Sequence, residues 1–489
     1  MPSKSSQIAI AVLAIFSAAT YAAELNEIRS TLGDQQSVAV TIYNNNLALV
    51  KDQRKVKLNS GLNSLALRDV SAQMRPETAL LRSLSHSGSL NTLEQDFDFD
   101  LLTPQKLLEK YVGKTVSIIK TNPATGLETT EQATVLSANN GTVLKIGNRI
   151  ETGLPANTSR IVYGDVPENL RDRPTLVTKL NSKTSAEQMV ELSYLTGGLG
   201  WKADYVAELN AKEDSLDLSG WVTLTNTSGA TYSNAKLQLV AGNVNLINSN
   251  VHTKQIAYGA TDALGASPAP MKAESLFEYH LYTLDHPTTI AENQTKQVAL
   301  LSAFGIPARK ELVLRGASHY YSSSYSNLGQ KLKVSTFIEF DNKEASKLGI
   351  PIPKGVIRAY KKDNLENAQF IGEDNIEHVA KNETVRFKAG ESFDVTATKK
   401  QTDFKFLQNP VDQSNRVKTR TYESAYEVVL KNAKKERISI TVEEPIPGDW
   451  QMLFLSHPNQ KASSNTAVWK IEIPAEGKTT LSYRVQVKY

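Results

Sequence analysis

Short runs in which apolar and polar residues alternate recur along the whole chain. The clearest runs are 38–43, 331–340, 437–442 and 469–473. A period of two places successive side chains on opposite faces of a strand, and clusters of Asn, Gly, Pro and Asp separate the runs. The pattern predicts a mainly β protein built of antiparallel β-sandwich domains, in which each sheet has one buried and one solvated face.

One segment has helical features. Thr103 is a good N-cap residue, Pro104 suits the first helical position, and Leu108 and Tyr111 fall on one side before Gly113. We therefore expect one short helix from Thr103 to Gly113.

Several short strands are expected directly after this helix. They are 115–120, 131–137, 142–146 and 160–163. Turn-forming Asn, Pro and Gly residues link them. The segment predicts a small independent β-barrel inserted into the chain.

These elements suggest a domain organisation. We expect a signal peptide at 1–22, an N-terminal β region at 23–102, the helix and small β-barrel at 103–166, and a large β-sandwich region at 174–489. The polar segment 167–174 would form the boundary before the large region. Residues 257–274 are rich in Ala and Pro and have little to bury, so we expect a mobile loop there.

The first residues have the features of a secretory signal peptide. Lys4 precedes the apolar run 8–16 and the small residues 17–23, with cleavage expected after Ala22. The pattern predicts a periplasmic or envelope-associated protein of a Gram-negative bacterium. No later stretch reaches the roughly 18 apolar residues of a membrane-spanning helix, so we expect at most peripheral membrane association.

Composition narrows the function classes. The chain has 489 residues, no cysteine and a net charge of +4, from 55 basic and 51 acidic residues. The missing cysteines exclude disulfides, thiolate metal sites and cysteine nucleophiles. Basic clusters such as Lys399-Lys400 lie among acidic residues without interleaved aromatic residues, so we expect a solvated face and no nucleic-acid partner.

One acidic cluster resembles the start of a calcium loop. Asp96, Asp98 and Asp100 alternate with two phenylalanines. The glycine and glutamate that complete such a loop are missing, and an edge strand with outward acids explains the same pattern. The cluster is a weak metal candidate, and we expect no cofactor.

No motif marks a catalytic residue. The chain has no Gly-x-Ser-x-Gly elbow, although a triad or a carboxylate pair assembled from separate strands leaves no sequence signal. Glu443 and Glu444 are adjacent, so on a strand they would point in opposite directions.

Three tyrosines form a speculative binding site. Tyr320, Tyr321 and Tyr325 lie in a Ser-rich turn and could offer flat rings to a glycan or a protein. Ordinary tyrosines at a hairpin tip are the alternative.

Several ordered blocks resemble a known family. They are LSYLTGGLGWKADY at 192–205, AKLQLVAGNVN at 235–245, EYHLYTLDHPTTIAENQTKQVALL at 278–301 and PGDW at 447–450, with the closing strand. These blocks are similar to a bacterial family of exported proteins of unknown function, whose C-terminal domain is shared with mucoidy inhibitor A. The resemblance implies the fold and compartment, but no agreed reaction. Within the first block, we expect Tyr194, Trp201 and Tyr205 to pack in the core.

These observations lead to two functional hypotheses. The first is a non-catalytic envelope scaffold or binding protein whose partner is an envelope protein or glycan. The alternative is a hydrolase that acts on envelope polysaccharide, with carboxylates that converge from separate strands.

Overall fold

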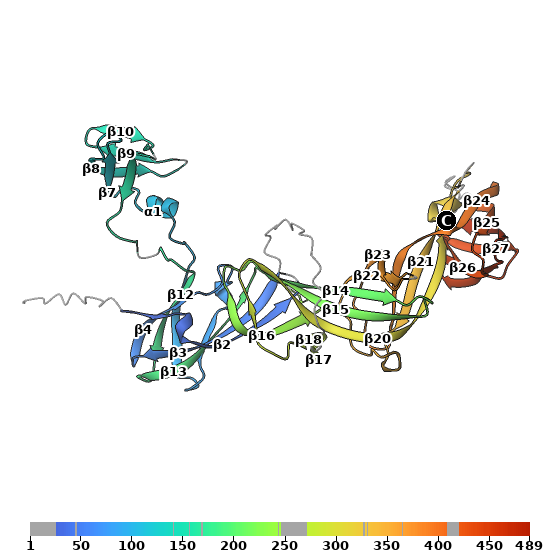
Figure 1. The fold of residues 1–489 in the computed structure, drawn as a ribbon, viewed down its shortest axis with the longest axis horizontal. Helices are drawn as coiled ribbons and strands as arrows, with labels where there is room; N and C mark the ends of the chain where they lie inside the picture. Colours follow the sequence, from blue (N-terminus) through green and yellow to red (C-terminus); the bar gives the residue numbers. More distant parts are fainter. Residues whose placement is uncertain are drawn as a thin grey trace, which may run out of the picture. The chain divides into compact units, whose positions relative to one another are not determined.

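Strands dominate the part of the chain that the structure describes (Figure 1). The computed structural model describes residues 26–44, 46–139, 141–155, 157–167, 170–242, 244–245, 271–325, 328–329, 331–363, 365–407 and 420–489. Within these residues it has strands β1 to β30 and one α-helix. Short 3-10 turns occupy Leu32–Asp34, Pro76–Thr78, Ser318–Tyr321 and Glu344–Ser346. The predicted mainly β fold with one short helix is confirmed, whereas the expected signal peptide lies outside the described residues.

The chain divides into two compact units. Unit 1 comprises residues 1–37 and 51–194, and unit 2 comprises residues 38–50 and 195–489. Three strands contain residues of both units: β2 (Gln35–Tyr43), β3 (Leu47–Leu58) and β13 (Ala186–Thr196). The domain boundaries expected from the sequence stay predictions.

Unit 1 contains a four-stranded sheet in the order β1-β4-β12-β6. Its strands are β1 (Glu27–Ser30), β4 (Gly61–Arg68), β12 (Thr175–Ser182) and β6 (Leu90–Asp98). The pair β1 and β4 is parallel, while the other pairs are antiparallel. A further strand, β5 (Leu80–Ser83), pairs with β13. The sequence predicted antiparallel sheets, but this sheet also contains one parallel pair.

Helix α1 (Pro104–Lys110) begins as the sequence predicts. The hydroxyl of Thr103 accepts a hydrogen bond of 3.2 Å from the backbone N–H of Lys106, which satisfies one of the free donors at the helix start. The helix ends at Lys110 rather than at Gly113. Leu108 and Tyr111 face a small apolar core shared with the following strands.

The strands after α1 form an open sheet, so the predicted small β-barrel is wrong. The strands are β7 (Thr115–Thr121), β8 (Glu128–Ser137), β9 (Val143–Ile146), β10 (Arg149–Thr152) and β11 (Ser159–Val162). Their order is β10-β9-β8-β7-β11. A barrel needs its first and last strands to pair, but β10 and β11, each four residues long, lie at opposite edges.

Most strands of unit 2 belong to one extended sheet, in the order β23-β22-β14-β15-β20-β21-β24-β25-β30-β27. Its strands are β14 (Leu199–Leu209), β15 (Ser215–Asn226), β20 (Gln294–Arg315), β21 (Leu332–Asp341), β22 (Gly355–Lys362), β23 (Ala368–Ile376), β24 (Thr384–Leu407), β25 (Thr421–Asn432), β27 (Asp449–Leu455) and β30 (Lys478–Lys488). The long strands β20 and β24 each pair with different neighbours along their length, which extends the sheet.

A second group of strands in unit 2 surrounds β16. It comprises β16 (Tyr232–Ala241), β17 (Lys272–Leu276), β18 (Tyr279–Thr283) and β19 (Thr288–Ile290), and β16 also pairs in parallel with β2. The mobile loop expected at 257–274 lies outside the described residues up to 270, and Lys272–Leu276 is a strand instead.

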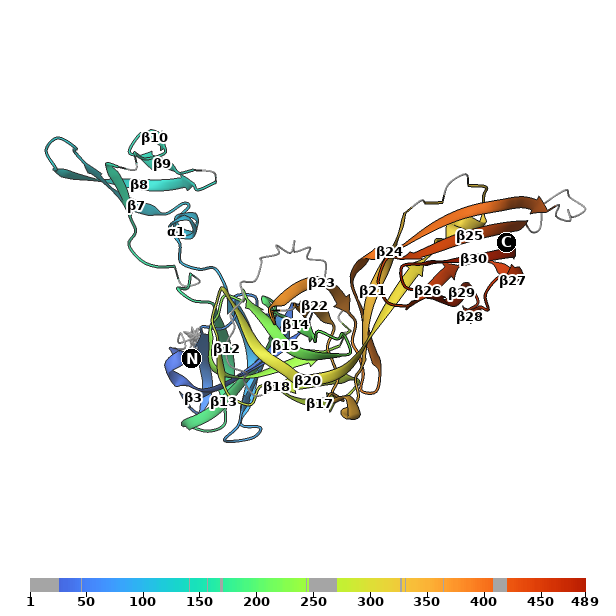
Figure 2. The ribbon, with the colours of Figure 1, turned by 45° about the vertical axis from the view of Figure 1, so that its right-hand side comes forward.

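The C-terminal part of unit 2 has its own core. Strands β26 (Ile438–Pro445), β28 (Gln460–Ser463) and β29 (Thr466–Ile473) complete it. Apolar side chains of β26 and β29 share one buried cluster with those of β24, β25 and β30, the last three of which lie side by side in Figure 2. Trp469 is fully buried in this cluster.

The aromatic residues of the block 192–205 are buried, as expected. Tyr194 belongs to unit 1, and Trp201 and Tyr205 belong to unit 2. The hydroxyl of Tyr205 donates a hydrogen bond of 2.7 Å to the carbonyl of Pro353, so its polar end is satisfied inside the core.

Candidate functional site

A lysine and a glutamate form a buried ion pair in the C-terminal core. Lys399 lies on β24 and Glu444 lies on β26, and each side chain is only 1 % exposed. The distance from Nζ of Lys399 to Oε1 of Glu444 is 2.7 Å. Burying two charges costs free energy that only close pairing and further hydrogen bonds can offset.

Two tyrosines complete the hydrogen bonding of the carboxylate. The hydroxyl of Tyr321 donates a hydrogen bond of 2.7 Å to Oε2 of Glu444 and lies 2.9 Å from the hydroxyl of Tyr483. Because the single proton of Tyr321 is used on Glu444, Tyr483 is the donor to Tyr321. Both carboxylate oxygens therefore have a partner.

Aromatic rings surround the ammonium group of Lys399. Its Nζ lies 4.6 Å from the ring centroid of Tyr320 and 4.7 Å from that of Tyr426. The rings of Tyr321 and Tyr483 lie at 5.6 and 5.7 Å. A cation this close to ring faces is attracted by their quadrupoles, most strongly where water is excluded.

Burial shifts the acidity of these groups. Desolvation lowers the pKa of Lys399, although Glu444 partly opposes the shift. Desolvation also holds the pKa of Tyr321 and of Tyr483 well above the usual range, and it raises the pKa of Tyr426 to about 12. The phenols therefore remain hydrogen-bond donors, and the neutral form of the lysine becomes more accessible.

The three tyrosines of the speculative binding site differ in exposure. Tyr321 is fully buried, so its ring is not available to a ligand. Tyr320 and Tyr325 are half-buried and pack against the same core. The hydroxyl of Tyr325 donates to the carbonyl of His319. Ligand binding by Tyr320 and Tyr325 stays a prediction.

The solvated face expected for Lys399 is wrong. Lys399 was expected on a solvated face with Lys400, but only Lys400 is exposed. The expectation for Glu443 and Glu444 is confirmed, since Glu444 is buried while Glu443 lies 3.5 Å from Arg315 near the surface. Alternation along 395–399 gave a signal for Lys399, because Val395 and Ala397 on the same face are buried.

An aromatic face lies at the end of the same sheet. We give this name to Phe404, Phe406, Tyr422 and Tyr489. The ring of Tyr422 lies 5.6 Å from that of Phe404, 5.5 Å from that of Phe406 and 5.8 Å from that of Tyr489. Phe406 is 57 % exposed and Tyr489 is 41 % exposed. This cluster was not among the binding residues expected from the sequence.

A β-bulge explains why these rings share a face. The pairing of β24 with β25 shifts between Gln401 and Asp403. One extra residue reverses the alternation, so Phe404 and Phe406 lie on the side of the sheet that Lys399 and Gln401 occupy. The aromatic face therefore continues the core side of β24 beyond the core itself.

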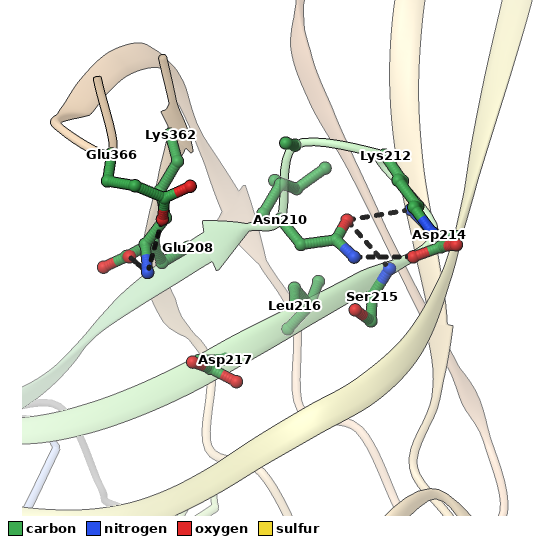
Figure 3. A pocket seen from close by; sticks show the side chains of 11 residues that line it. Glu208, Asn210, Lys212, Asp214, Ser215, Leu216, Asp217, Lys362 and Glu366 are labelled. Atoms are coloured by element: carbon green, nitrogen blue, oxygen red, sulfur yellow. Dashed lines mark hydrogen bonds and ion pairs between the residues drawn. The ribbon is translucent and has the colours of Figure 1, made fainter. Parts of the chain in front are cut away.

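A pocket of about 390 Å³ lies at the turn between β14 and β15 (Figure 3). Lys362 lies 3.3 Å from Glu208 and 3.8 Å from Glu366. The amide of Asn210 donates a hydrogen bond of 2.6 Å to Asp214. Ion pairs and a hydrogen bond within the protein thus already engage Glu208, Glu366 and Asp214. The hydrogen bond with Glu208 raises the pKa of Lys362.

The weak metal candidate has basic partners. Asp98 lies 2.9 Å from Arg171, and Asp100 lies 3.7 Å from Lys106 and 3.3 Å from Lys110. Asp96 is exposed on β6. Among the described residues, no group of three or more His, Asp or Glu side chains is placed to hold a metal ion.

Comparisons with known proteins identify a domain but no activity. Residues 190–489 match the model of a family described as a domain of unknown function, DUF4139. No curated protein matches the chain. Within the described residues, no helix is long and apolar enough to cross a membrane. The buried ion pair and the aromatic face both lie inside the matched region.

Proposed function

The chain belongs to the DUF4139 family, and on this premise we propose that it is an exported, non-catalytic protein of the bacterial envelope. In this proposal the protein binds its partner through the aromatic face. The DUF4139 region would be the part that it shares with mucoidy inhibitor A.

The exposure of the aromatic face is the observation that supports binding. Phe406 and Tyr489 leave large apolar surfaces in water beside Phe404 and Tyr422. Contiguous exposed apolar surface is typical of interaction sites, and aromatic residues are enriched at protein interfaces. Sheet pairing fixes the backbone of Phe404, Phe406 and Tyr422, so no backbone would have to be ordered there on binding.

The chemistry of the face favours a protein over a glycan. Phe404 and Phe406 carry no polar group, so apolar side chains of a protein partner would be desolvated against them. On the opposite side of β24, Asp403 lies 2.8 Å from Arg484. These charges keep the outer side of the sheet polar.

Differential capture from native envelope extracts tests this proposal. Immobilised wild-type protein is compared with Phe406→Ser and with Phe393→Ser, a control residue that is 93 % exposed on the same strand but outside the aromatic face. We expect a partner that wild type and Phe393→Ser retain and Phe406→Ser loses. Equal capture by all three proteins would show that the partner does not bind through the aromatic face.

Export is tested separately. The signal pattern around Lys4 and the small residues up to Ala22 supports it. The N-terminal sequence of the protein from the envelope fraction should begin at Ala23 or Glu24. An unprocessed chain that stays in the cytoplasm would contradict export.

The polysaccharide hydrolase remains the alternative function. We place it at the pocket by the β14 and β15 turn, because Glu208, Asp214, Asp217 and Glu366 all line this pocket. Asp217 accepts a hydrogen bond of 2.7 Å from the backbone of Gly305, and Lys362 neutralises Glu208. Both carboxylates therefore already have partners within the protein. Polysaccharide turnover that Glu208→Gln abolishes would establish this alternative.

A further inference from the structure

The buried pair has the geometry of a reaction site. We propose that Nζ of Lys399 and Cδ of Glu444 form an amide bond, which links β24 to β26 covalently inside the C-terminal core. The inference is independent of the proposed binding function.

The fold holds the two reacting groups together. Nζ of Lys399 lies 2.7 Å from Oε1 of Glu444, and both side chains are 1 % exposed. Lys399 is fixed on β24 by pairing with β25, and Glu444 is fixed on β26 by pairing with β29. Well-oriented groups inside one molecule react as if at effective concentrations of about 10⁵ to 10⁸ M. Proximity therefore supplies much of what an amide-forming reaction needs.

The reaction requires no other reactant. Transfer of a proton from Nζ to Oε1 converts the ion pair into an amine and a carboxylic acid. The nitrogen lone pair then attacks Cδ, and the new N–C bond forms. The bond between Cδ and Oε1 breaks, Oε1 leaves with two protons as water, and Oε2 remains as the amide oxygen. One ammonium and one carboxylate thus give one amide and one water molecule.

Burial favours each of these steps. An ion pair in the core carries a larger desolvation cost than a neutral amide does, and the released water can leave the core. Only the neutral amine is a nucleophile, and desolvation lowers the pKa of Lys399 toward that form.

The neighbouring side chains support the same atoms. Tyr321 donates a hydrogen bond to Oε2 of Glu444, the oxygen that becomes negative in the tetrahedral intermediate. The hydroxyl of Tyr483 in turn donates to that of Tyr321. Gly316 leaves space for the carboxyl group, since a Cβ at this position would collide with Glu444. The aromatic rings around Nζ exclude water, which would otherwise hydrate the amine.

The link would act as a staple in a chain without cysteine. It would join two strands 45 residues apart in sequence. A cross-link between separate strands stabilises the fold chiefly by restricting the unfolded chain, as a disulfide does.

Mass spectrometry of the purified, denatured full chain tests the proposal. We expect the wild-type mass to fall short of the sequence mass by one water molecule. After trypsin digestion, we expect a branched species that joins 389–400 to 438–461, because the amide blocks cleavage after Lys399. Lys399→Met should restore the complete mass, whereas Lys400→Met, at the exposed neighbour, should keep the loss.

A second variant separates chemistry from folding. Tyr321→Phe keeps the ring but removes the donor to Oε2, so a time course of the purified protein should show slower loss of water than the wild type. A complete wild-type mass, together with free cleavage after Lys399, would overturn the proposal. This result does not depend on whether any variant folds.

Discussion

Tyr321 donates a hydrogen bond of 2.7 Å to Oε2 of Glu444, across 123 positions of the sequence. The bond links the short turn at Ser318–Tyr321 to strand β26, and Glu444 in turn pairs with Lys399 on β24. Three separate segments therefore depend on one carboxylate. The stability of the C-terminal core should be sensitive to each member of this network.

Removal of Lys399 should destabilise the protein strongly. Lys399→Met leaves the charge of Glu444 buried without its partner, so we expect the free energy of unfolding to fall by about 3 to 5 kcal/mol. The double variant Lys399→Met with Glu444→Gln should lose less than the sum of the two single losses, because it buries no unpaired charge. Urea denaturation of the four proteins measures both effects, and strict additivity would contradict the coupling.

Gly316 should not tolerate a side chain. A methyl group at this position would collide with the carboxylate of Glu444, so Gly316→Ala should cost about 1 to 3 kcal/mol of stability. A Cβ at Gly200, on β14, would meet no atom within 4 Å, which makes Gly200→Ala the matched control. Thermal unfolding compares the two variants. Equal losses would show that the effect is not specific to the network.

Alkaline pH should weaken the fold through Tyr426. Burial raises the pKa of this phenol from 10.0 to about 12, so the folded state holds the proton more tightly than the unfolded state does. Its contribution to stability is complete below pH 10 and is lost as the pH rises from 10 to about 12. Tyr426→Phe should therefore flatten the fall in stability over this range. An unchanged slope of unfolding free energy against pH would argue against a buried, protonated Tyr426.

Calcium should leave the stability of unit 1 unchanged. Arg171 contacts Asp98 at 2.9 Å and Lys110 contacts Asp100 at 3.3 Å, so basic groups already pair with two of the three carboxylates that a cation would use. We expect the same unfolding temperature with calcium and with a chelator. A calcium-dependent rise that Asp98→Asn abolishes would instead restore the metal site at Asp96, Asp98 and Asp100.

The sequence predicted local features well. Alternation located β2, β21, β26 and β29 to within a few residues, and Thr103 with Pro104 marked the start of α1. These features depend on short-range physics, namely the two-residue period of a strand and the capping of a helix. The same rules could not show that β10 and β11 lie at opposite edges, because pairing between distant strands leaves no local pattern.

The candidate sites could not be predicted from local sequence patterns alone. Lys399 was expected on a solvated face because the basic cluster lies among acidic residues without interleaved aromatic residues, although alternation with Val395 and Ala397 places it in the core. The bulge near Gln401 moved Phe404 to the opposite face, and no residue type marks such an insertion. Only the fold brings Tyr489 to the ring of Tyr422.

Site-specific photo-cross-linking in living cells tests the central claim most directly. A photoreactive phenylalanine analogue is placed at position 406 in the aromatic face, and at position 393 as the exposed control on the same strand. The proposed function predicts a discrete protein adduct from position 406 and none from position 393. No adduct at 406, or the same adducts from both positions, would contradict partner binding through the aromatic face.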